Sequence, residues 1–208
     1  MYIPNKFKIT EKTHKHQFIQ EYGFGALISS GDDLTASHLP FVLHPDESEQ
    51  GVLYAHCAKA NSHWKNLEGQ NVLVIFTGPH GYISPSWYTS KPAVPTWNYT
   101  AVHAYGVASL LDPQDTLKAI DEIVEKYEPQ LLVEKDIVTD QIKQKLLANI
   151  VGFRIELTKL EGQLKLGQNR SQDDQAGAYQ ALSNSNNLDN LALAKYMQKQ
   201  NIGLGKLE

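Results

Sequence analysis

Short runs of alternating hydrophobic and polar residues recur along the chain, a pattern typical of half-buried β-strands. The runs at 24–30 and 34–44 flank a Gly/Asp turn at 31–33, so they predict an antiparallel hairpin. Pro40 lies inside the second run and cannot donate to a strand ladder, which places this strand at a sheet edge or at a bulge. Further strands are predicted at 51–58, 71–78, 96–111 and 153–162, with a short one near Tyr82 and Ile83 in a loop rich in proline.

Other segments have the spacing of helices. A helix is predicted from about Glu11 to Tyr22, a short one within 59–69, and another at about 140–150. A further helix begins at Asp112, the expected N-cap, and its predicted buried stripe consists of Leu117, Ile120, Val124 and Tyr127. After a polar segment at 183–190, residues 191–201 predict a short amphipathic helix that cannot fold alone at this length.

The strands follow one another in hairpin-like succession and do not alternate with helices. This order argues against a doubly wound sheet and predicts a mainly β, α+β protein: a six- or seven-stranded antiparallel split β-barrel with peripheral helices. We expect the barrel domain over residues 1–180, followed by a polar hinge and the short helix over 181–208.

Composition narrows the possible classes of protein. Hydrophobic residues make up 41% of the 208, enough for a packed core. No apolar run approaches the roughly 20 residues of a membrane span, and the N-terminus lacks the apolar region of a secretory signal. Cys57 is the only cysteine, which excludes an intrachain disulfide and suits a cytoplasmic location. The net charge of -4 gives no broad positive field for nucleic acid.

Motifs for several kinds of chemistry are missing. The sequence contains no dinucleotide-binding glycine fingerprint, no P-loop and no Gly-x-Ser-x-Gly elbow, and its eight histidines show no metal-binding spacing, so we expect no metal site. Three polar insertions stand out instead: ASHLP at 36–40, HCAKANSHW at 56–64 and KLGQNR at 165–170. Cations with hydroxyl or amide donors are what a phosphate dianion needs when no P-loop is present.

The order of several longer motifs resembles that of a known family. MYIPNKF, ASHLPFVL, LYAHCAKANSHWK, FTGPHGYISPSWY, VPTWNYTAVHAYG and LKLGQNR follow one another as in the PaiB family. Its members are FMN-binding split-barrel proteins, related to the pyridoxamine-phosphate-oxidase type and often labelled negative transcriptional regulators. The resemblance covers roughly residues 1–180 and implies a homodimer with FMN between the subunits.

The resemblance also implies which residues hold the cofactor. Lys59 and Asn61, with His56 and Ala58 nearby, would hold the phosphate and ribityl chain. Ser37, His38 and Leu39 would line the flavin ring, partly through backbone donors. Trp97, Asn98 and Tyr99 would also reach the ring, either within the same subunit or from the partner subunit. Lys165, Gln168, Asn169 and Arg170 would close over the phosphate. The family usually has serine where this chain has Gly167. If that hydroxyl contacts the flavin phosphate, this chain lacks one contact, although a backbone N–H can still donate and glycine permits close approach.

Three functions remain open from the sequence. The first is a flavin-dependent oxidoreductase of the flavin-reductase kind, with a nicotinamide electron donor as a candidate partner. No catalytic residue is assigned, although His38 and His103 are candidates for proton transfer. The second is transcriptional regulation through flavin state, a partner or DNA; direct DNA binding is not expected, because no basic recognition helix is visible. The third is a split barrel that binds haem.

Overall fold

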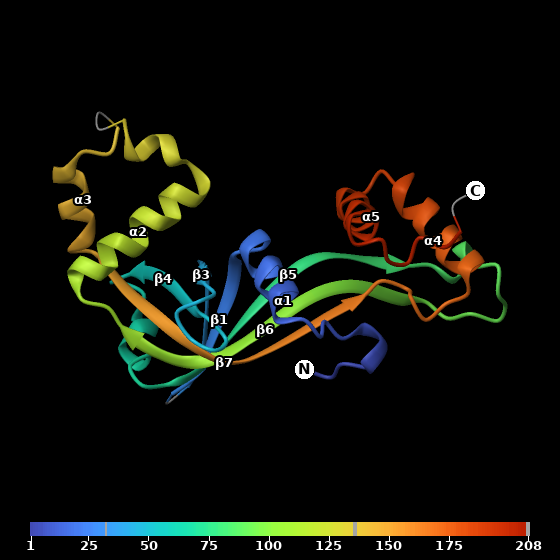
Figure 1. Ribbon diagram of the computed structural model, residues 1–208, viewed down its shortest axis with the longest axis horizontal. Coiled ribbons are helices and arrows are strands. Elements are labelled where there is room, and N and C mark those ends of the chain that lie inside the picture. Colours follow the sequence, from blue (N-terminus) through green and yellow to red (C-terminus); the bar gives the residue numbers. More distant parts are fainter. Residues whose placement is uncertain (32, 135–136, 207–208) are drawn as a thin grey trace. The chain divides into compact units, whose positions relative to one another are not determined.

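The computed structural model describes residues 1–31, 33–134 and 137–206. Within them, seven strands form a sheet in the order β2-β1-β5-β6-β7-β4-β3, and every pairing with a recorded register is antiparallel. This confirms the α+β fold class with seven strands. Figure 1 shows these elements. Their bounds are β1 Phe24–Ser30, β2 Leu34–Pro40, β3 Val42–His44, β4 Val52–Ala58, β5 Asn71–Ile83, β6 Thr96–Leu110 and β7 Ile150–Lys165.

The predicted hairpin is present, but its second strand is divided. β1 pairs with β2 from Phe24 opposite Pro40 to Ser30 opposite Leu34; residue 32 of the predicted turn lies outside the described residues. The chain breaks at Phe41, whose N–H donates to the carbonyl of Gly23 at 2.7 Å. β2 and β3 therefore lie at opposite ends of the strand order, and β2 also lies against β4. The break after Pro40 carries the chain from one sheet edge to the other, as closure of a barrel requires.

β5 continues through Pro79, where the sequence predicted a loop with a separate short strand. The recorded pairing with β1 covers only residues 72–75 of β5, so Pro79 lies beyond it and its missing N–H disrupts no ladder bond on that side. The Pro79 carbonyl accepts a hydrogen bond from Thr100 Oγ1 at 3.1 Å. The alternation of hydrophobic and polar residues correctly predicted the position of β5, but Pro79 wrongly suggested that the strand ends before it.

The chain forms two compact units. Unit 1 comprises Met1–Glu11, Thr77–Val102 and Glu161–Glu208, and unit 2 comprises Lys12–Phe76 and His103–Leu160. Fully buried side chains fill each: Leu166, Leu182 and Leu193 in unit 1, and Leu53, Phe76, Phe153 and others in unit 2. Unit 1 holds η1 Asn5–Phe7, η3 Pro85–Trp87, α4 Gln172–Ser183 and α5 Leu188–Gln200; unit 2 holds α1 Lys12–Glu21, η2 Ser62–Asn66, α2 Pro113–Tyr127, η4 Pro129–Leu132 and α3 Asp140–Leu147.

The last helix lies where the sequence placed it, and it has a partner. α5 packs against α4, a helix that the sequence analysis did not predict (Figure 1). Asn187 caps α5 by accepting from the N–H groups of Asp189 and Asn190. No helix among the described residues has both the length and the apolar character needed to cross a membrane.

α2 begins as predicted, with the Asp112 side chain accepting from the N–H of Asp115, but its buried face differs from the predicted stripe. Thr116 and Ala119 are the buried residues, whereas Tyr127 is 59% exposed. A Cβ on Gly152 of β7 would lie 2.5 Å from Thr116 Oγ1, so the glycine lets this side of the helix approach the strand. Leu117, Ile120 and Val124 instead line an apolar hollow with residues of η4 and α3.

Candidate functional site

A hydrogen-bonded cluster joins two of the predicted site residues in unit 2. Asn61 Nδ2 donates to Ser37 Oγ at 3.0 Å, and Ser37 Oγ lies 2.9 Å from Nδ1 of His63. The other ring nitrogen of His63, Nε2, lies 2.9 Å from Ser29 Oγ. Asn61 also caps η2, because its Oδ1 accepts from the His63 N–H at 3.1 Å. We call Ser29, Ser37, Asn61 and His63 the hydroxyl cluster.

His63 is the member of this cluster that sequence reasoning missed. Its side chain is 4% exposed, and burial lowers its pKa, which favours the neutral ring. It lies within the HCAKANSHW insertion, two residues after Asn61, so the motif contained it. The N-cap was the sequence signal that could have identified His63. The side chain of an N-cap Asn accepts a hydrogen bond from the backbone N–H two residues later, so a cap at Asn61 places His63 beside it.

The other predicted residues of β2 do not share the position of Ser37. Ser37 and Leu39 are half-buried on one face of the strand, whereas His38 points to the opposite face and is exposed. The His38 ring stacks near Phe24 with 6.3 Å between centroids. Three consecutive residues therefore cannot all line one ring through their side chains.

The predicted residues of β4 and of the segment after it also differ in position, and His56 is the first of them along the chain. His56 lies opposite Gly152 of β7, and directly paired residues project from the same face of a sheet. Because Gly152 is the position where Thr116 of α2 approaches, His56 projects toward the side that α2 covers. Its Nδ1 is buried without a hydrogen-bond partner among the described residues, and burial lowers its pKa.

Ala58 and Lys59 are exposed at the end of β4. The Lys59 backbone is anchored: its N–H donates to the Asn149 carbonyl at 2.8 Å, and its carbonyl accepts from Trp64 Nε1 at 3.0 Å. The residue borders an open hollow with Thr116 and Gln144. Lys59 therefore has a fixed backbone and an exposed position, but no recorded contact with Ser37 or Asn61.

In unit 1, the predicted phosphate residues form a turn at 165–170, which we call the cationic turn. Lys165 Nζ donates to Thr96 Oγ1 at 2.7 Å. Burial lowers the pKa of Lys165, and the nearby positive charge of Arg170 lowers it further. The Arg170 guanidinium lies 4.6 Å from the ring centroid of Tyr88. Among the described residues, neither Lys165 nor Arg170 forms an ion pair with a carboxylate, so two like charges lie close together without compensation.

The remaining residues of the cationic turn hold its shape. Gln168 accepts from the Leu166 N–H at 2.8 Å and donates to the Leu164 carbonyl at 2.7 Å, so its amide is occupied by the turn itself. Gly167 has φ of 84°, a left-handed conformation that favours glycine. Asn169 is exposed. The glycine that departs from the family pattern thus fits the backbone that it occupies.

The aromatic group on β6 is divided by strand alternation. Trp97 is 54% exposed and Tyr99 is half-buried, whereas Asn98 between them is 2% exposed. A Cβ on Gly167 would lie 3.6 Å from Asn98 Nδ2, so Asn98 belongs beside the cationic turn. The Trp97 ring lies edge-on to Tyr82, with 6.1 Å between centroids. The aromatic side chains of Trp97 and Tyr99 are therefore accessible from outside, whereas the side chain of Asn98 is buried.

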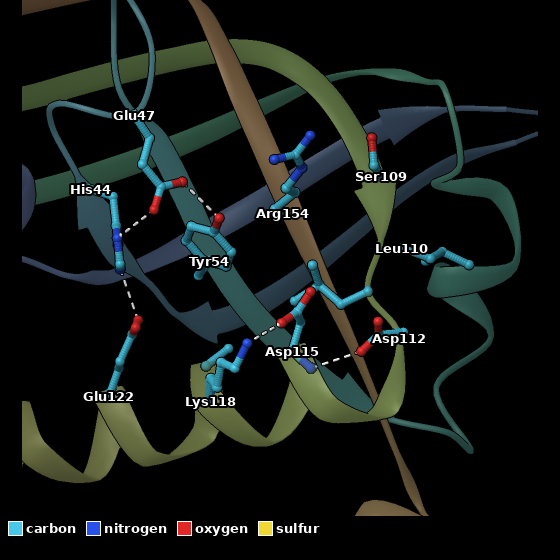
Figure 2. A pocket seen from close by; sticks show the side chains of 12 residues that line it. His44, Glu47, Tyr54, Ser109, Leu110, Asp112, Asp115, Lys118, Glu122 and Arg154 are labelled. Carbon is cyan, nitrogen blue, oxygen red and sulfur yellow. Dashed lines mark hydrogen bonds and ion pairs between the residues drawn. The ribbon is translucent and has the colours of Figure 1, made fainter.

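A cavity of about 580 Å³ in unit 2 contains none of the predicted residues. Figure 2 shows His44 at its wall, held between two carboxylates: Nδ1 lies 2.8 Å from Glu47 and Nε2 lies 2.8 Å from Glu122. Tyr54 also donates to Glu47, at 2.7 Å. Four carboxylates and three basic side chains line this cavity: Glu47, Asp112, Asp115 and Glu122, with His44, Lys118 and Arg154. The acidic excess disfavours a phosphate dianion there.

Each of the two predicted groups, taken by itself, has donors that suit the phosphate of a flavin mononucleotide. The hydroxyl cluster of unit 2 offers amide and hydroxyl groups. The cationic turn of unit 1 offers two positive charges that have no carboxylate partner among the described residues. Among the same residues, no three His, Cys, Asp or Glu side chains come together as metal ligands.

Comparison with known sequences agrees with this chemistry. The family model with the description "Putative FMN-binding domain" matches residues 1–159, and the chain belongs to this family, whose cofactor is FMN. Within it the chain is a PaiB-type protein: it is 36% identical over 204 residues to "Protease synthase and sporulation protein PAI 2" of Bacillus subtilis, covering 95% of this chain and 97% of the relative. A protein of Emericella nidulans, AN0679, is 32% identical over 190 residues, covering 73% and 76%.

Solved structures confirm the split-barrel fold. The flavocytochrome Anf3 of Azotobacter vinelandii superposes with a TM-score of 0.64 at 13% identity, over 80% of this chain and 73% of that one. The FAD and heme binding protein of Mycobacterium smegmatis gives 0.61 at 14% identity, over 77% and 74%. At these identities the likeness concerns the fold, and the ligands of those proteins are not carried over.

Proposed function

We propose that the protein is an FMN-dependent oxidoreductase of the flavin-reductase kind, working as a homodimer. The observation that carries the anion-binding part is the cationic turn, where Lys165 and Arg170 lie in one short turn and neither forms an ion pair with a carboxylate among the described residues. Such a pair is electrostatically unfavourable alone and becomes favourable beside a phosphate dianion. Family membership identifies the phosphate compound as FMN.

The residues that would hold the cofactor have separable tasks. In unit 1, Lys165 and Arg170 would supply positive charge to a phosphate. In unit 2, taken by itself, Ser37 and Asn61 would supply hydrogen bonds that orient one. Trp97 and Tyr99 would offer aromatic faces to the ring. FMN, when bound, supplies hydride or electron transfer, so the chain needs no nucleophile of its own.

Four measurements test the proposal: a visible spectrum, stabilisation by FMN, nicotinamide oxidation and sedimentation. The purified protein should show the visible bands of a flavin or acquire them with FMN, and FMN at 100 times its Kd should stabilise the fold by about 2.7 kcal/mol. The FMN-loaded protein should then oxidise a reduced nicotinamide with a free flavin or dye as acceptor. A protein that FMN neither colours nor stabilises refutes the cofactor proposal, and a loaded protein inert toward both nicotinamides refutes the reductase part. Sedimentation at several concentrations tests the homodimer.

A second candidate is control of gene expression, and it is favoured by the name of the Bacillus subtilis relative, which refers to protease synthase and sporulation. The net charge of -4 and the absence of a basic recognition helix favour an indirect route, through flavin state or a partner protein. A gel-shift measurement at physiological salt separates the routes. Sequence-specific binding would make direct DNA recognition the better explanation.

A further inference from the structure

The His63 ring lies between two hydroxyl groups and is too deeply buried to touch a ligand. Its Nδ1 faces Ser37 Oγ and its Nε2 faces Ser29 Oγ, each at 2.9 Å, and the side chain is 4% exposed. Ser37 and Asn61 are half-buried, so they can reach a ligand. Whatever His63 does at this site must therefore act through Ser37.

The hydrogen bonds of Asn61 fix one part of the pattern. Its Oδ1 accepts from the His63 N–H, so its Nδ2 must be the group that donates to Ser37 Oγ. Ser37 Oγ has one hydrogen to donate and a second lone pair. The position of the ring proton on His63 decides how these are used.

Two arrangements of a neutral ring are possible. With the proton on Nε2, Nδ1 accepts the Ser37 hydrogen, and Ser37 can offer a ligand only a lone pair. With the proton on Nδ1, the ring donates to Ser37, Ser29 donates to Nε2, and the Ser37 hydrogen is free to point at a ligand. Both serines can donate or accept, so the cluster satisfies either arrangement.

We propose that His63 is a positioning residue that carries its ring proton on Nδ1 in the flavin complex and thereby makes the Ser37 hydroxyl a donor to the FMN phosphate. The inference rests on the proposed function. A phosphate dianion has only acceptor oxygens, so a lone pair of Ser37 facing it would be repelled. The ring nitrogens contact Ser29 from β1 and Ser37 from β2, and the Asn61 cap contacts the His63 backbone; none of these side chains titrates near neutral pH. Burial, which lowers the His63 pKa, favours a change of tautomer over a gain of charge.

Two substitutions separate the ring nitrogens. In His63→Asn the side-chain amide nitrogen occupies the place of Nδ1 and can still donate to Ser37. In His63→Gln the amide nitrogen reaches the place of Nε2 instead. We expect H63Q to weaken FMN binding about tenfold, the equivalent of roughly 1.4 kcal/mol, while riboflavin, which lacks the phosphate, binds as before. H63N should keep FMN affinity within about threefold, and H14N on α1 is the matched control for the His-to-Asn change.

Nitrogen NMR of the unsubstituted protein gives an independent test that does not depend on variant folding. The two ring nitrogens of His63, assigned by their absence from the H63N spectrum, should show a protonated Nδ1 and an unprotonated Nε2 when FMN is bound. A proton on Nε2 in the complex overturns the inference, and so does an equal loss of FMN and riboflavin affinity in H63Q. If the unsubstituted protein binds no flavin at all, the proposed function fails first, which distinguishes the two failures.

Discussion

The hydroxyl cluster and the cationic turn are both polar, but they are prepared for a ligand in different ways. In the hydroxyl cluster every hydrogen bond joins neutral groups, with donor–acceptor distances of 2.9–3.1 Å. In the cationic turn, Lys165 and Arg170 lie near each other without a carboxylate partner among the described residues. The first group is satisfied without a ligand, whereas the second is completed by an anion.

This difference teaches what each group can contribute to binding. Charge acts over a distance close to the Debye length, about 8 Å at physiological salt, so the cationic turn should supply most of the affinity and its salt dependence. Neutral hydrogen bonds depend on direction and distance, so the hydroxyl cluster should supply selectivity for the phosphate end. Variants that alter only one of the two groups can separate the contribution of charge from that of directional hydrogen bonds.

The largest effect is expected when both charges are removed. The double variant K165A/R170A should bind FMN about 100-fold more weakly, because two charge-assisted contacts of about 1.5 kcal/mol each are lost. Its affinity should also vary less with salt, and riboflavin binding should change little. Fluorescence titration at several salt concentrations measures this, with K195A as the control for removing an exposed lysine from unit 1. Unchanged FMN affinity would show that the turn is not the phosphate site.

A charge placed in the neutral cluster should act less strongly. Asn61→Asp keeps an oxygen to accept from the His63 N–H, but it loses the donor to Ser37 and adds a negative charge. We expect FMN affinity to fall about tenfold, with a smaller loss for riboflavin. Asn66→Asp, at the exposed end of the same short helix, is the matched control. Equal effects of N61D and N66D on FMN affinity would mean that the added negative charge acts through long-range electrostatics and not through the hydrogen bond to Ser37.

Acid should destabilise the fold through buried histidines. Burial lowers the pKa values of both His56 and His63, so below about pH 6.5 the unfolded chain binds more protons than the folded one. The free energy of unfolding should therefore decrease as pH falls from 7 toward 5, by about 1.4 kcal/mol for each unit of pKa difference. Urea unfolding across this range measures the slope, and H63N should reduce it. A slope that H63N leaves unaltered would assign the effect to His56 or to other groups.

The fold was more predictable than the site, and the reason is physical. Alternation and turn residues reflect local burial, so they located the strand segments, although they joined β2 and β3 into one strand and ended β5 too early, and the Asp112 cap located α2. Pro79 misled because a proline is tolerated in a strand beyond the paired region, a fact that depends on the neighbouring strand. The Tyr127 stripe was wrong because the face of α2 that is buried is set by Gly152 on a distant strand.

The site, like the buried face of α2, depends on contacts between residues that are far apart in the sequence. Neighbouring residues such as Ser37 and His38, or Trp97 and Asn98, point to opposite faces, so a motif read as a continuous string overstates how many of its side chains meet one ligand. His63 was inside a quoted motif but became a candidate only when the hydroxyls of Ser29 and Ser37 were seen on either side of its ring. Sequence reasoning gave the kinds of residue, and folding decided which of them meet.

The smallest effect concerns Gly167, and it tests whether the cationic turn needs its backbone shape. At φ of 84° a side chain is strained, yet only Asn98 Nδ2, at 3.6 Å, lies within 4 Å of an added Cβ, so the cost of Gly167→Ser is that of the backbone alone, about 1 kcal/mol. Gly69→Ala is the matched control, because Gly69 has φ of 70° and nothing within 4 Å of an added Cβ. Urea unfolding should give similar losses of stability for both variants, while FMN affinity should change only in G167S. A G167S protein that is more stable than the parent would show that the serine hydroxyl gains a contact within the turn that outweighs the backbone strain.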